Sequence, residues 1–463
     1  MDRIFKPKSV AVIGASDNPG KLGFHVMKSL TRGGYGGRIF PVNPGKGEIL
    51  GIEAFPSLLH IPEEVDLAII VLPAEQVPKT IKACEEKGTK GVVLITAGFK
   101  EIEDRRGEEL QREITDLADR AGIKVIGPNT FGIVNLSLPL NASFTPEFSL
   151  VKKGGVSLIS QSGGVSHLLA FLSMRMRIGM SKIVGLGNRC NVDFAEMVDY
   201  LNEDPDTQVI AIYMEGIDHP RRLMEAAERT SARKPIVAYK VGRSQASDRA
   251  SQLHTGSLAG RHSIYEGAFR QAGILMVQSS EELLDAAKAL ATSSLPRGKR
   301  LAVLSGQAGP GMAACDVAEL EGLSLPAFSP HTQRSIEAFL PPLAMRTNPV
   351  DMGPAWYDSG AIKGIVQSVL EDENIDAILL CIMFASANRA SAGMLSELLV
   401  ERKERKPVLC CLSSPEGIWD DEIQKLEEAG IPNFPTPERA AKALANLVRF
   451  KKMRGEGEKT GSR

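Results

Sequence analysis

The residue of this chain best suited to carry out chemistry is His254. It lies in the stretch 244–260, which is small, polar and free of proline and follows an apolar run ending at Tyr239. Loops of this kind often carry functional groups, and a neutral imidazole is a competent nucleophile near neutral pH. The other six histidines have no acidic or cysteine partner at metal-ligand spacing, so we predict no metal site on this chain. Composition alone does not separate catalysis by His254 from a surface role.

A second candidate is Glu215, which follows the apolar run Val209–Met214. In an open parallel sheet the carboxyl ends of the strands face the ligand crevice. A carboxylate at that place could hold an imidazole in one tautomer, as the orienting acid of a catalytic triad does. The alternative is a solvated strand end, which would be favoured if His254 were absent.

Three glycine-rich turns each stand between an apolar run and a segment typical of a helix. They span residues 14–23, 160–165 and 305–311. Glycine lets the backbone approach a ligand, and a helix N-terminus offers free N–H groups and a positive dipole end to an anion. The second and third turns predict sites for a small anion such as phosphate. Each is a weak signal alone, and the two together are more informative.

The first turn favours a phosphate-bearing, nucleotide-like cofactor other than NAD. Gly14 and Ser16 stand where a dinucleotide fingerprint would have two glycines, and no acidic residue for a ribose follows the second strand at 42–44. Lys21 and Lys46 could meet the phosphates of the cofactor. A tight turn needed only for packing is the alternative.

The elements that position these residues are predicted to be parallel strands covered by helices. Near-continuous Val, Ile and Leu runs indicate strands buried on both faces. The segment 135–155 is polar and contains proline, which indicates a crossing between domains, and 292–298 indicates a linker. The predicted strands lie at residues 9–14, 38–42, 67–71, 91–95, 156–159, 183–185, 209–213, 235–239 and 301–304.

Composition excludes several classes of function. Lys and Arg number 55 against 56 Asp and Glu, so no net charge favours nucleic acid or an anionic membrane. The longest apolar runs have the length of a strand and cannot span a bilayer. Six cysteines with only Cys410 and Cys411 close together form neither a disulfide framework nor a zinc site. We therefore predict a cytoplasmic protein, and the length of 463 residues suggests about three domains.

A series of short motifs, in this order along the chain, resembles one family. The chain is similar over nearly its whole length to the α subunit of ADP-forming acetyl-CoA synthetases, relatives of succinyl-CoA synthetase. Only the histidine motif is specific when taken singly. The motifs lie at residues 12–16, 41–44, 95–99, 127–129, 160–164, 185–188, 254–257 and 348–351.

The resemblance implies an α/β fold of three domains and a short tail. Residues 1–128 would form a Rossmann-like CoA-binding domain. Residues 129–295 would form a flavodoxin-like, parallel-sheet CoA-ligase domain with the phosphohistidine loop. Residues 296–455 would form a second domain of that kind, and 456–463 a tail.

The resemblance also implies roles for individual residues. His254 would be phosphorylated, and Glu215 would be its local partner. Thr130 departs from the family, because relatives often have cysteine there, so we assign no thiol at this place. The CoA-binding residues would be Gly14, Ser16, Lys21, Val42, Asn43, Val71, Pro73, Thr96, Ala97, Gly98 and Phe99, and the phosphate-binding residues Ser162, Gly163, Gly164, Gly309, Pro310 and Gly311.

The reaction implied by the resemblance is that of an acetate–CoA ligase. It interconverts acyl-CoA, ADP and phosphate with acid, ATP and CoA through an acyl phosphate and phospho-His254, with Mg²⁺ accompanying the nucleotide. We find no ATP-grasp segment in the chain, which predicts that the nucleotide site lies on an ATP-grasp β subunit in an α2β2 heterotetramer. Two alternatives stay open: a nicotinamide-dependent oxidoreductase, and a non-catalytic CoA-binding regulatory or scaffold protein of the same fold. The acyl group and the preferred purine are not indicated.

Overall fold

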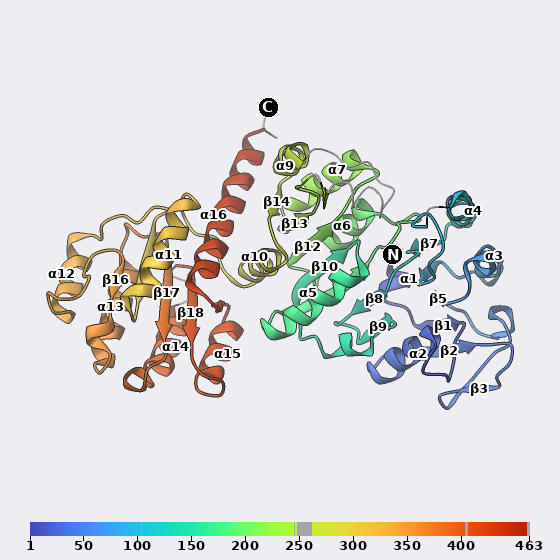
Figure 1. The fold of residues 1–463 in the computed structure, drawn as a ribbon, viewed down its shortest axis with the longest axis horizontal. Coiled ribbons are helices and arrows are strands. Elements are labelled where there is room, and N and C mark those ends of the chain that lie inside the picture. Colours follow the sequence, from blue (N-terminus) through green and yellow to red (C-terminus); the bar gives the residue numbers. More distant parts are fainter. Residues whose placement is uncertain (103, 245, 248–261, 403–405, 461–463) are drawn as a thin grey trace. The chain divides into compact units, whose positions relative to one another are not determined.

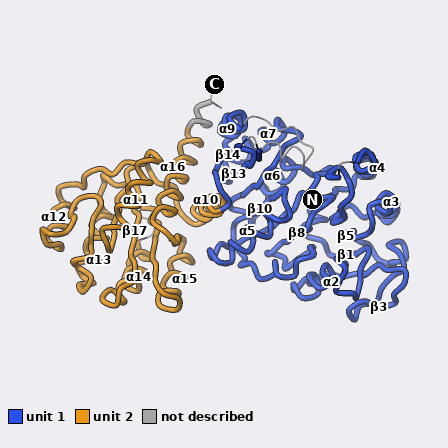
Figure 2. Tube along the Cα trace, viewed as in Figure 1, with its two compact units in different colours: residues 1–280 blue, residues 281–463 orange. Residues whose placement is uncertain are grey.

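The computed structural model describes residues 1–102, 104–244, 246–247, 262–402 and 406–460. The chain forms two compact units, residues 1–280 and 281–463 (Figure 2). Unit 1 contains two of the larger sheets, and unit 2 contains a third. The predicted α/β class with parallel sheets is confirmed. The predicted domain boundaries at 128 and 295 stay predictions.

The first sheet of unit 1 is parallel, with the strand order β2-β1-β5-β6-β7. Central strands of such a sheet are covered on both faces, and β1, β5 and β6 are accordingly buried along their whole length. Helix α2 (Leu22–Arg32) covers one face, and α3 (Val77–Lys87) and α4 (Arg105–Ala121) lie side by side on the other (Figure 1). The strands are β1 (Ser9–Ile13), β2 (Arg38–Val42), β5 (Leu67–Ile70), β6 (Gly91–Leu94) and β7 (Lys124–Ile126). Small elements around them are α1 (Asp2–Phe5), β3 (Glu48–Ile49) and β4 (Ile52–Glu53).

The second sheet of unit 1 is mixed, with the order β14-β13-β12-β10-β11-β8-β9. Five strands are parallel: β10 (Lys153–Ser160), β11 (Met180–Gly185), β12 (Val209–Met214), β13 (Ile236–Lys240) and β14 (Ile274–Val277). Helix α5 (Gly163–Arg175) packs against β10 and β11, and α6 (Phe194–Glu203) packs beside α7 (Pro220–Ser231), with α9 (His262–Gln271) against β14.

Two antiparallel strands extend this sheet, and the sequence interpretation named neither of them. β8 (Gly132–Asn135) pairs with β11, and β9 (Leu140–Ser143) pairs with β8. The segment 135–155, taken as a polar crossing, therefore contains β9 and a 3₁₀ turn at Pro146–Leu150. The strand was missed because it is short and polar, although its residues are buried.

The sheet of unit 2 is parallel, with the order β16-β15-β17-β18. Helices α11 (Ala308–Leu320) and α16 (Pro437–Thr460) pack together, and α12 (Pro330–Phe339), α13 (Ser359–Glu371), α14 (Ser391–Arg402) and α15 (Asp420–Glu428) pack in series. Helix α10 (Ser280–Thr292) joins this unit through the ion pairs of Lys288 with Glu427 and of Asp285 with Arg439. The strands are β15 (Leu301–Ser305), β16 (Val350–Asp351), β17 (Ala377–Met383) and β18 (Val408–Ser413).

All three sheets share one topological feature. The first parallel strand in the chain lies between the second and the third: β1 between β2 and β5, β10 between β11 and β12, and β15 between β16 and β17. The connections from neighbouring strands therefore leave toward opposite faces, which opens a crevice at the carboxyl ends where such sheets bind ligands. Each of the three glycine-rich turns directly follows one of these first strands.

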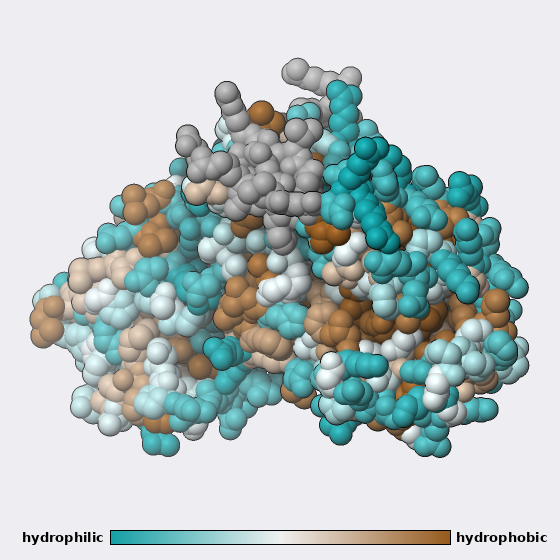
Figure 3. Space-filling view, turned by 45° about the vertical axis from the view of Figure 1, so that its right-hand side comes forward, coloured by the Kyte–Doolittle hydropathy of each residue, from teal (hydrophilic) through white to brown (hydrophobic). Residues whose placement is uncertain are grey.

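No helix in the described part of the chain is long and apolar enough to cross a membrane. The face drawn in Figure 3 is a mosaic of hydrophilic and hydrophobic side chains. Exposed apolar residues such as Leu150 and Leu343 are common on folded proteins and need no separate explanation.

The core of the second sheet contains a fully buried ion pair. Lys182 Nζ donates to Asp204 Oδ2 at 2.5 Å, and both side chains are 0% exposed. Thr207 also donates its hydroxyl to this carboxylate. Burying two charges costs desolvation energy that their attraction only partly recovers, so removing one partner leaves an uncompensated charge.

We predict that Asp204→Ala lowers the free energy of unfolding by about 3–5 kcal/mol, because it strands the Lys182 ammonium in the core. Urea unfolding followed by circular dichroism measures this loss. Glu203→Ala is the matched control: Glu203 pairs with Arg233 at 2.9 Å on the surface, and its loss should change stability by less than about 0.5 kcal/mol. Equal effects of the two substitutions would contradict the prediction.

Candidate functional site

A large cavity opens at the carboxyl ends of β1, β2 and β5, at the switch point of the first sheet. Its volume is about 960 Å³, which suits a sizeable cofactor. Among the residues that line it are seven of those predicted to bind the cofactor: Gly14, Ser16, Lys21, Val42, Asn43, Val71 and Pro73.

Backbone packing explains the glycines of the first turn. Gly14 has a φ of +95°, and a Cβ there would lie 2.7 Å from the carbonyl oxygen of Val71. A Cβ on Gly23, in the first turn of α2, would lie 2.0 Å from the carbonyl oxygen of Gly14. Asn43 Nδ2 donates to the carbonyl oxygen of Ala15 at 2.9 Å, which ties the end of β2 to this turn. The turn is therefore held closely between α2, β2 and β5.

Three lysines near this cavity differ in their surroundings. Lys21 is the N-cap residue of α2 and lines the cavity. Lys46 pairs with Asp17 at 3.0 Å, a hydrogen bond that lowers the pKa of the Asp17 carboxyl, and it is not among the lining residues. Lys79 on α3 lines the cavity and was missed, since its only signal is that α3 follows the switch-point strand β5.

The predicted cofactor residues Thr96, Ala97, Gly98 and Phe99 do not line this cavity. The turn that they form is held by Glu101, whose carboxylate accepts from the backbone N–H of Gly98 at 2.5 Å and from that of Phe99 at 3.2 Å. The same carboxylate accepts from Asn188 Nδ2, which lies beyond β11 of the second sheet. This turn thus connects the two sheets of unit 1.

The second switch point brings Glu215 close to the second glycine turn. Glu215 follows β12 and is 8% exposed. Gln161, in the turn after β10, accepts with Oε1 from the backbone N–H of Glu215 at 2.9 Å and of Gly216 at 3.1 Å. Both residues border a small cavity of about 20 Å³, which is further lined by Lys100, Asn129, Gly187, Asn188 and Arg189.

Charged groups surround this small cavity. Lys100 Nζ lies 3.6 Å from Asp218 Oδ2, and Arg189 Nη2 donates to the same oxygen at 2.7 Å. Arg189 Nε lies 3.4 Å from Asp193 Oδ1, which also caps α6. Burial lowers the pKa of Lys100, opposed by the charge of Asp218, and burial raises the pKa of Asp193, opposed by Arg189. Sequence reasoning missed these residues because the contacts join segments far apart in the chain.

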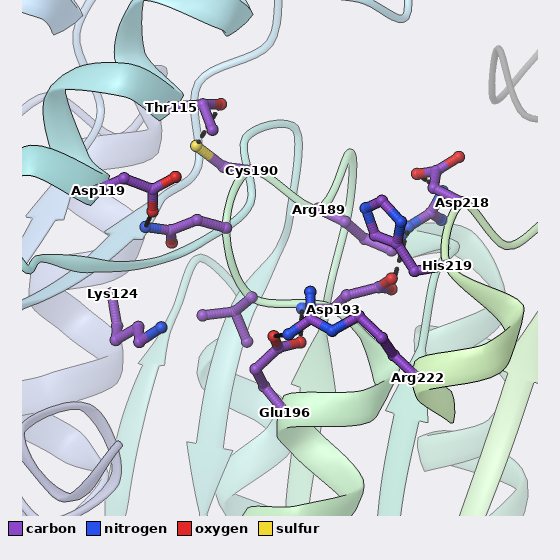
Figure 4. Close-up of a pocket in the computed structure, with 12 residues that line it drawn as sticks. Thr115, Asp119, Lys124, Arg189, Cys190, Asp193, Glu196, Asp218, His219 and Arg222 are labelled. Carbon is purple, nitrogen blue, oxygen red and sulfur yellow. Dashed lines mark hydrogen bonds and ion pairs between the residues drawn. The ribbon is translucent and has the colours of Figure 1, made fainter. Parts of the chain in front are cut away.

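A second polar cavity, of about 320 Å³, is also lined by Arg189. Figure 4 shows Arg189, Asp218 and His219 grouped on one side of it, with Cys190 turned toward Thr115. Cys190 Sγ lies 3.1 Å from Thr115 Oγ1, and burial raises the pKa of the thiol to about 12. This cysteine is therefore a poor nucleophile at neutral pH.

The second and third glycine turns each begin a helix. Ser162 is the N-cap of α5, and its hydroxyl accepts from the N–H of Val165 at 3.4 Å. Apart from the adjoining residues and the backbone of the same helix, no described atom lies within 4 Å of a Cβ placed on Gly163, Gly164 or Gly309. Packing against the rest of the described chain therefore does not require glycine at these positions. Gly311 differs, because its Cβ would lie 3.0 Å from Ser305 Cβ. Pro310 stands in the first turn of α11.

The sequence analysis singled out two further positions, His254 and Thr130. His254 lies outside the described residues. Thr130 is buried, donates its hydroxyl to the carbonyl oxygen of Gly185 at 2.7 Å and accepts from the N–H of Gly132 at 3.0 Å. A structural role at the join of β8 and β11 therefore accounts for the threonine.

Comparison with known families matches two parts of unit 1 and the start of unit 2. Residues 8–135 match the CoA binding domain, and residues 153–290 match the succinyl-CoA ligase like flavodoxin domain. The two matched segments contain the first and second switch points.

Similar proteins cover nearly the whole chain. Acetate–CoA ligase [ADP-forming] II subunit alpha of Pyrococcus furiosus is 38% identical over 99% of both chains. Acetate–CoA ligase [ADP-forming] I of Archaeoglobus fulgidus is 40% identical over 98% of this chain, which spans 64% of the length of that relative. Among solved structures, the dinucleotide forming acetyl-coenzyme A synthetase 1 of Ca. Korarchaeum cryptofilum, in complex with phosphate and ADP, has a TM-score of 0.91 at 34% identity. That match covers 99% of this chain and 98% of the other.

We predict that Gly164→Ala weakens phosphate binding at least about tenfold without loss of stability. A Cβ on residue 164 meets no described atom within 4 Å beyond the adjoining residues and the backbone of α5, but it would intrude on an anion held by the first amides of α5. Alanine also favours a helix over glycine by up to about 1 kcal/mol, so stability should not fall. Calorimetric phosphate titration and thermal unfolding measure the two effects.

Gly393→Ala is the matched control for this substitution. Gly393 lies in the first turn of α14, and a Cβ there meets only Glu422 Oε1, at 4.0 Å. It should change stability in the same way as Gly164→Ala and leave phosphate binding unchanged. Normal phosphate affinity in Gly164→Ala would show that the second turn is not an anion site.

Proposed function

We propose a mechanism for this chain on the basis of its family. The chain belongs to the α subunits of ADP-forming acetate–CoA ligases. It is therefore a subunit of an acid–thiol ligase that interconverts acyl-CoA, ADP and phosphate with acid, ATP and CoA. The relatives named as ligases favour this catalytic function over a non-catalytic CoA-binding scaffold.

The observation that carries the proposed mechanism is the position of Glu215. It is a buried carboxylate at the same switch point as the anion-binding turn of α5, and Gln161 joins the two. CoA would occupy the cavity of the first switch point, where Lys21 and Lys79 are available for its phosphates. Ser162, Gly163 and Gly164 would hold phosphate through the first amides of α5, and Gly309–Gly311 at the start of α11 would offer a second anion-binding turn.

The chemistry then proceeds in three transfers. A phosphate oxygen attacks the thioester carbonyl carbon, CoA leaves as the thiolate, and an acyl phosphate forms. An imidazole nitrogen of His254 attacks the phosphorus, and the carboxylate of the acid leaves. An oxygen of the ADP β-phosphate attacks phospho-His254, which gives ATP and the free imidazole. Glu215 accepts the N–H of the His254 ring and stabilises its developing positive charge, while preorganised backbone amides stabilise the phosphoryl group.

The remaining components are assigned to a partner. An α subunit implies a second subunit, and we propose an ATP-grasp β subunit in an α2β2 heterotetramer. Among the described residues no group of three or more His, Cys, Asp or Glu could hold a metal ion. We therefore assign Mg²⁺, which accompanies nucleotide phosphates, to the nucleotide site and derive no step on this chain from it. Six free cysteines suit the cytoplasm, where we place the reaction.

We predict that His254→Ala abolishes net turnover, by at least about 10³-fold, while the Kd for CoA stays within about twofold. The imidazole carries the phosphoryl group and does not hold the cofactor. Turnover and calorimetric CoA binding measure the two effects. In the wild-type enzyme the phosphoryl label should be lost in acid and kept in alkali, as for a phosphoramidate.

The matched control for this substitution is His331→Ala, which removes an exposed histidine from α12 of unit 2. It should leave both turnover and labelling unchanged. Turnover that survives His254→Ala, or a label that survives acid, would contradict the role of His254.

We predict that the two half-reactions separate between the subunits. This chain alone, given acyl-CoA and radiolabelled phosphate, should label His254, because the CoA cavity, Glu215 and both anion-binding turns are on this chain. Labelled ATP should do nothing until the partner is added. An alkaline gel of the isolated subunit with each donor tests this directly. Labelling by ATP alone would place a nucleotide site on this chain, and no labelling by acyl-CoA would show that the partner completes the site.

A further inference from the structure

The end of the β10–β12 ladder is closed by a side chain instead of the backbone. In a parallel pair, every second residue donates to one residue of the neighbouring strand and accepts from the residue two positions further on. The N–H of Gln161 donates to the carbonyl oxygen of Tyr213 at 3.2 Å, as the ladder requires. The next N–H, that of Glu215, donates instead to Gln161 Oε1 at 2.9 Å.

The side-chain oxygen of Gln161 takes a second N–H as well. Gly216 donates to it at 3.1 Å, so one oxygen accepts from two successive amides. Gln161 is 7% exposed and Glu215 is 8% exposed, so removing the oxygen would take an acceptor away from two successive buried amides. The backbone on both sides of the Glu215 Cα is thus fixed to the turn that begins α5.

At the third switch point a glutamine of the turn makes a similar contact, but the residue that it holds is not acidic. In unit 2, Gln307 Oε1 accepts from the N–H of Met383 at 3.1 Å, and Gln307 Nε2 donates to the carbonyl oxygen of Met383 at 2.8 Å. Cys381 pairs with Ser305 as Tyr213 pairs with Ser160, so Met383 occupies the place that Glu215 has at the second switch point. At both switch points a glutamine of the turn thus accepts from the same backbone N–H position, and the residue at that position is acidic only at the second switch point, where it is Glu215.

We propose that Gln161 is a positioning residue that fixes Glu215 relative to the phosphate-binding turn. This inference rests on the proposed function of Glu215. Gln161 does not act on the reacting atoms, and its contribution to the rate passes through Glu215. Its carbonyl-type oxygen adds no charge beside Glu215 and the bound phosphate, which a carboxylate in the same place would do. The ligand served by this arrangement is an inorganic phosphate or acyl phosphate.

The test is a double-mutant cycle in the complete enzyme with its partner subunit. Gln161→Met keeps the approximate volume of the side chain and removes the acceptor. Alone, it should lower kcat for acyl-phosphate formation and histidine labelling about 10–100-fold and change the KM for phosphate less than threefold. Combined with Glu215→Gln, it should add less than about threefold, because the group that it positions is already lost.

Gln307→Met is the internal comparator for the cycle. It contacts the backbone of Met383 instead of that of an acidic residue, so the loss of rate that it causes should multiply with the loss caused by Glu215→Gln. Gln161→Asn, which stays polar but is one methylene too short to reach, should behave as Gln161→Met does. It serves as the second variant if Gln161→Met does not fold, which thermal unfolding of each variant checks.

The possible outcomes separate this inference from the proposed function. If Glu215→Gln alone is as active as the wild type, the proposed function of Glu215 fails and the positioning role falls with it. If Glu215→Gln is slow and the loss from Gln161→Met multiplies with it, only the positioning role is overturned. A raised KM for phosphate with unchanged kcat would likewise overturn it and make Gln161 part of the phosphate site.

Discussion

The rest of the structure depends on what happens to backbone hydrogen bonds where a parallel ladder stops. At a switch point the chain segments after two paired strands turn toward opposite faces of the sheet, which opens a crevice and leaves the next amides without ladder partners. Buried amides need an acceptor, so the fold must either supply one or bring in a ligand. The chain does this at three sheets. The large cavity, Glu215 and the glycine turns are all found at these places.

The three switch points meet this constraint in different ways. In the first, the backbones themselves approach closely, because Gly14 admits the carbonyl oxygen of Val71 where a Cβ would stand. In the second and third, glutamine side chains close the ladder. The first solution leaves a wide cavity of about 960 Å³ for a cofactor. The second leaves only about 20 Å³ beside Glu215, which suits a single small group held in one orientation.

The sequence predicted those features that depend on short stretches of neighbouring residues. Apolar runs placed most parallel strands of the two sheets of unit 1 but only β15 in unit 2, and a glycine turn follows the first strand at each switch point. The antiparallel strands β8 and β9 were missed, because each has only four residues and a segment that short resembles a connection. The contacts of Gln161 with Glu215, and of Lys100 and Arg189 with Asp218, were also beyond reach, since they join residues that only the fold brings together. His254 was predicted from its sequence motif; it lies outside the described residues, and its role stays a prediction.

The large cavity of the first switch point and the small cavity beside Glu215 are connected by hydrogen bonds within unit 1. Glu101 accepts from two amides of the turn at 96–99 and from Asn188, which lines the small cavity with Glu215. Thr96 in turn donates its hydroxyl to the carbonyl oxygen of Leu72, which lines the large cavity, at 2.7 Å. A continuous set of hydrogen bonds therefore runs from the wall of one cavity to the wall of the other. Because each donor in it is directional and partly or fully buried, displacement of the turn at 96–99 would break bonds at both ends. The geometry around Glu215 is thus set jointly by the two sheets of unit 1, and not by the loop of Glu215 alone.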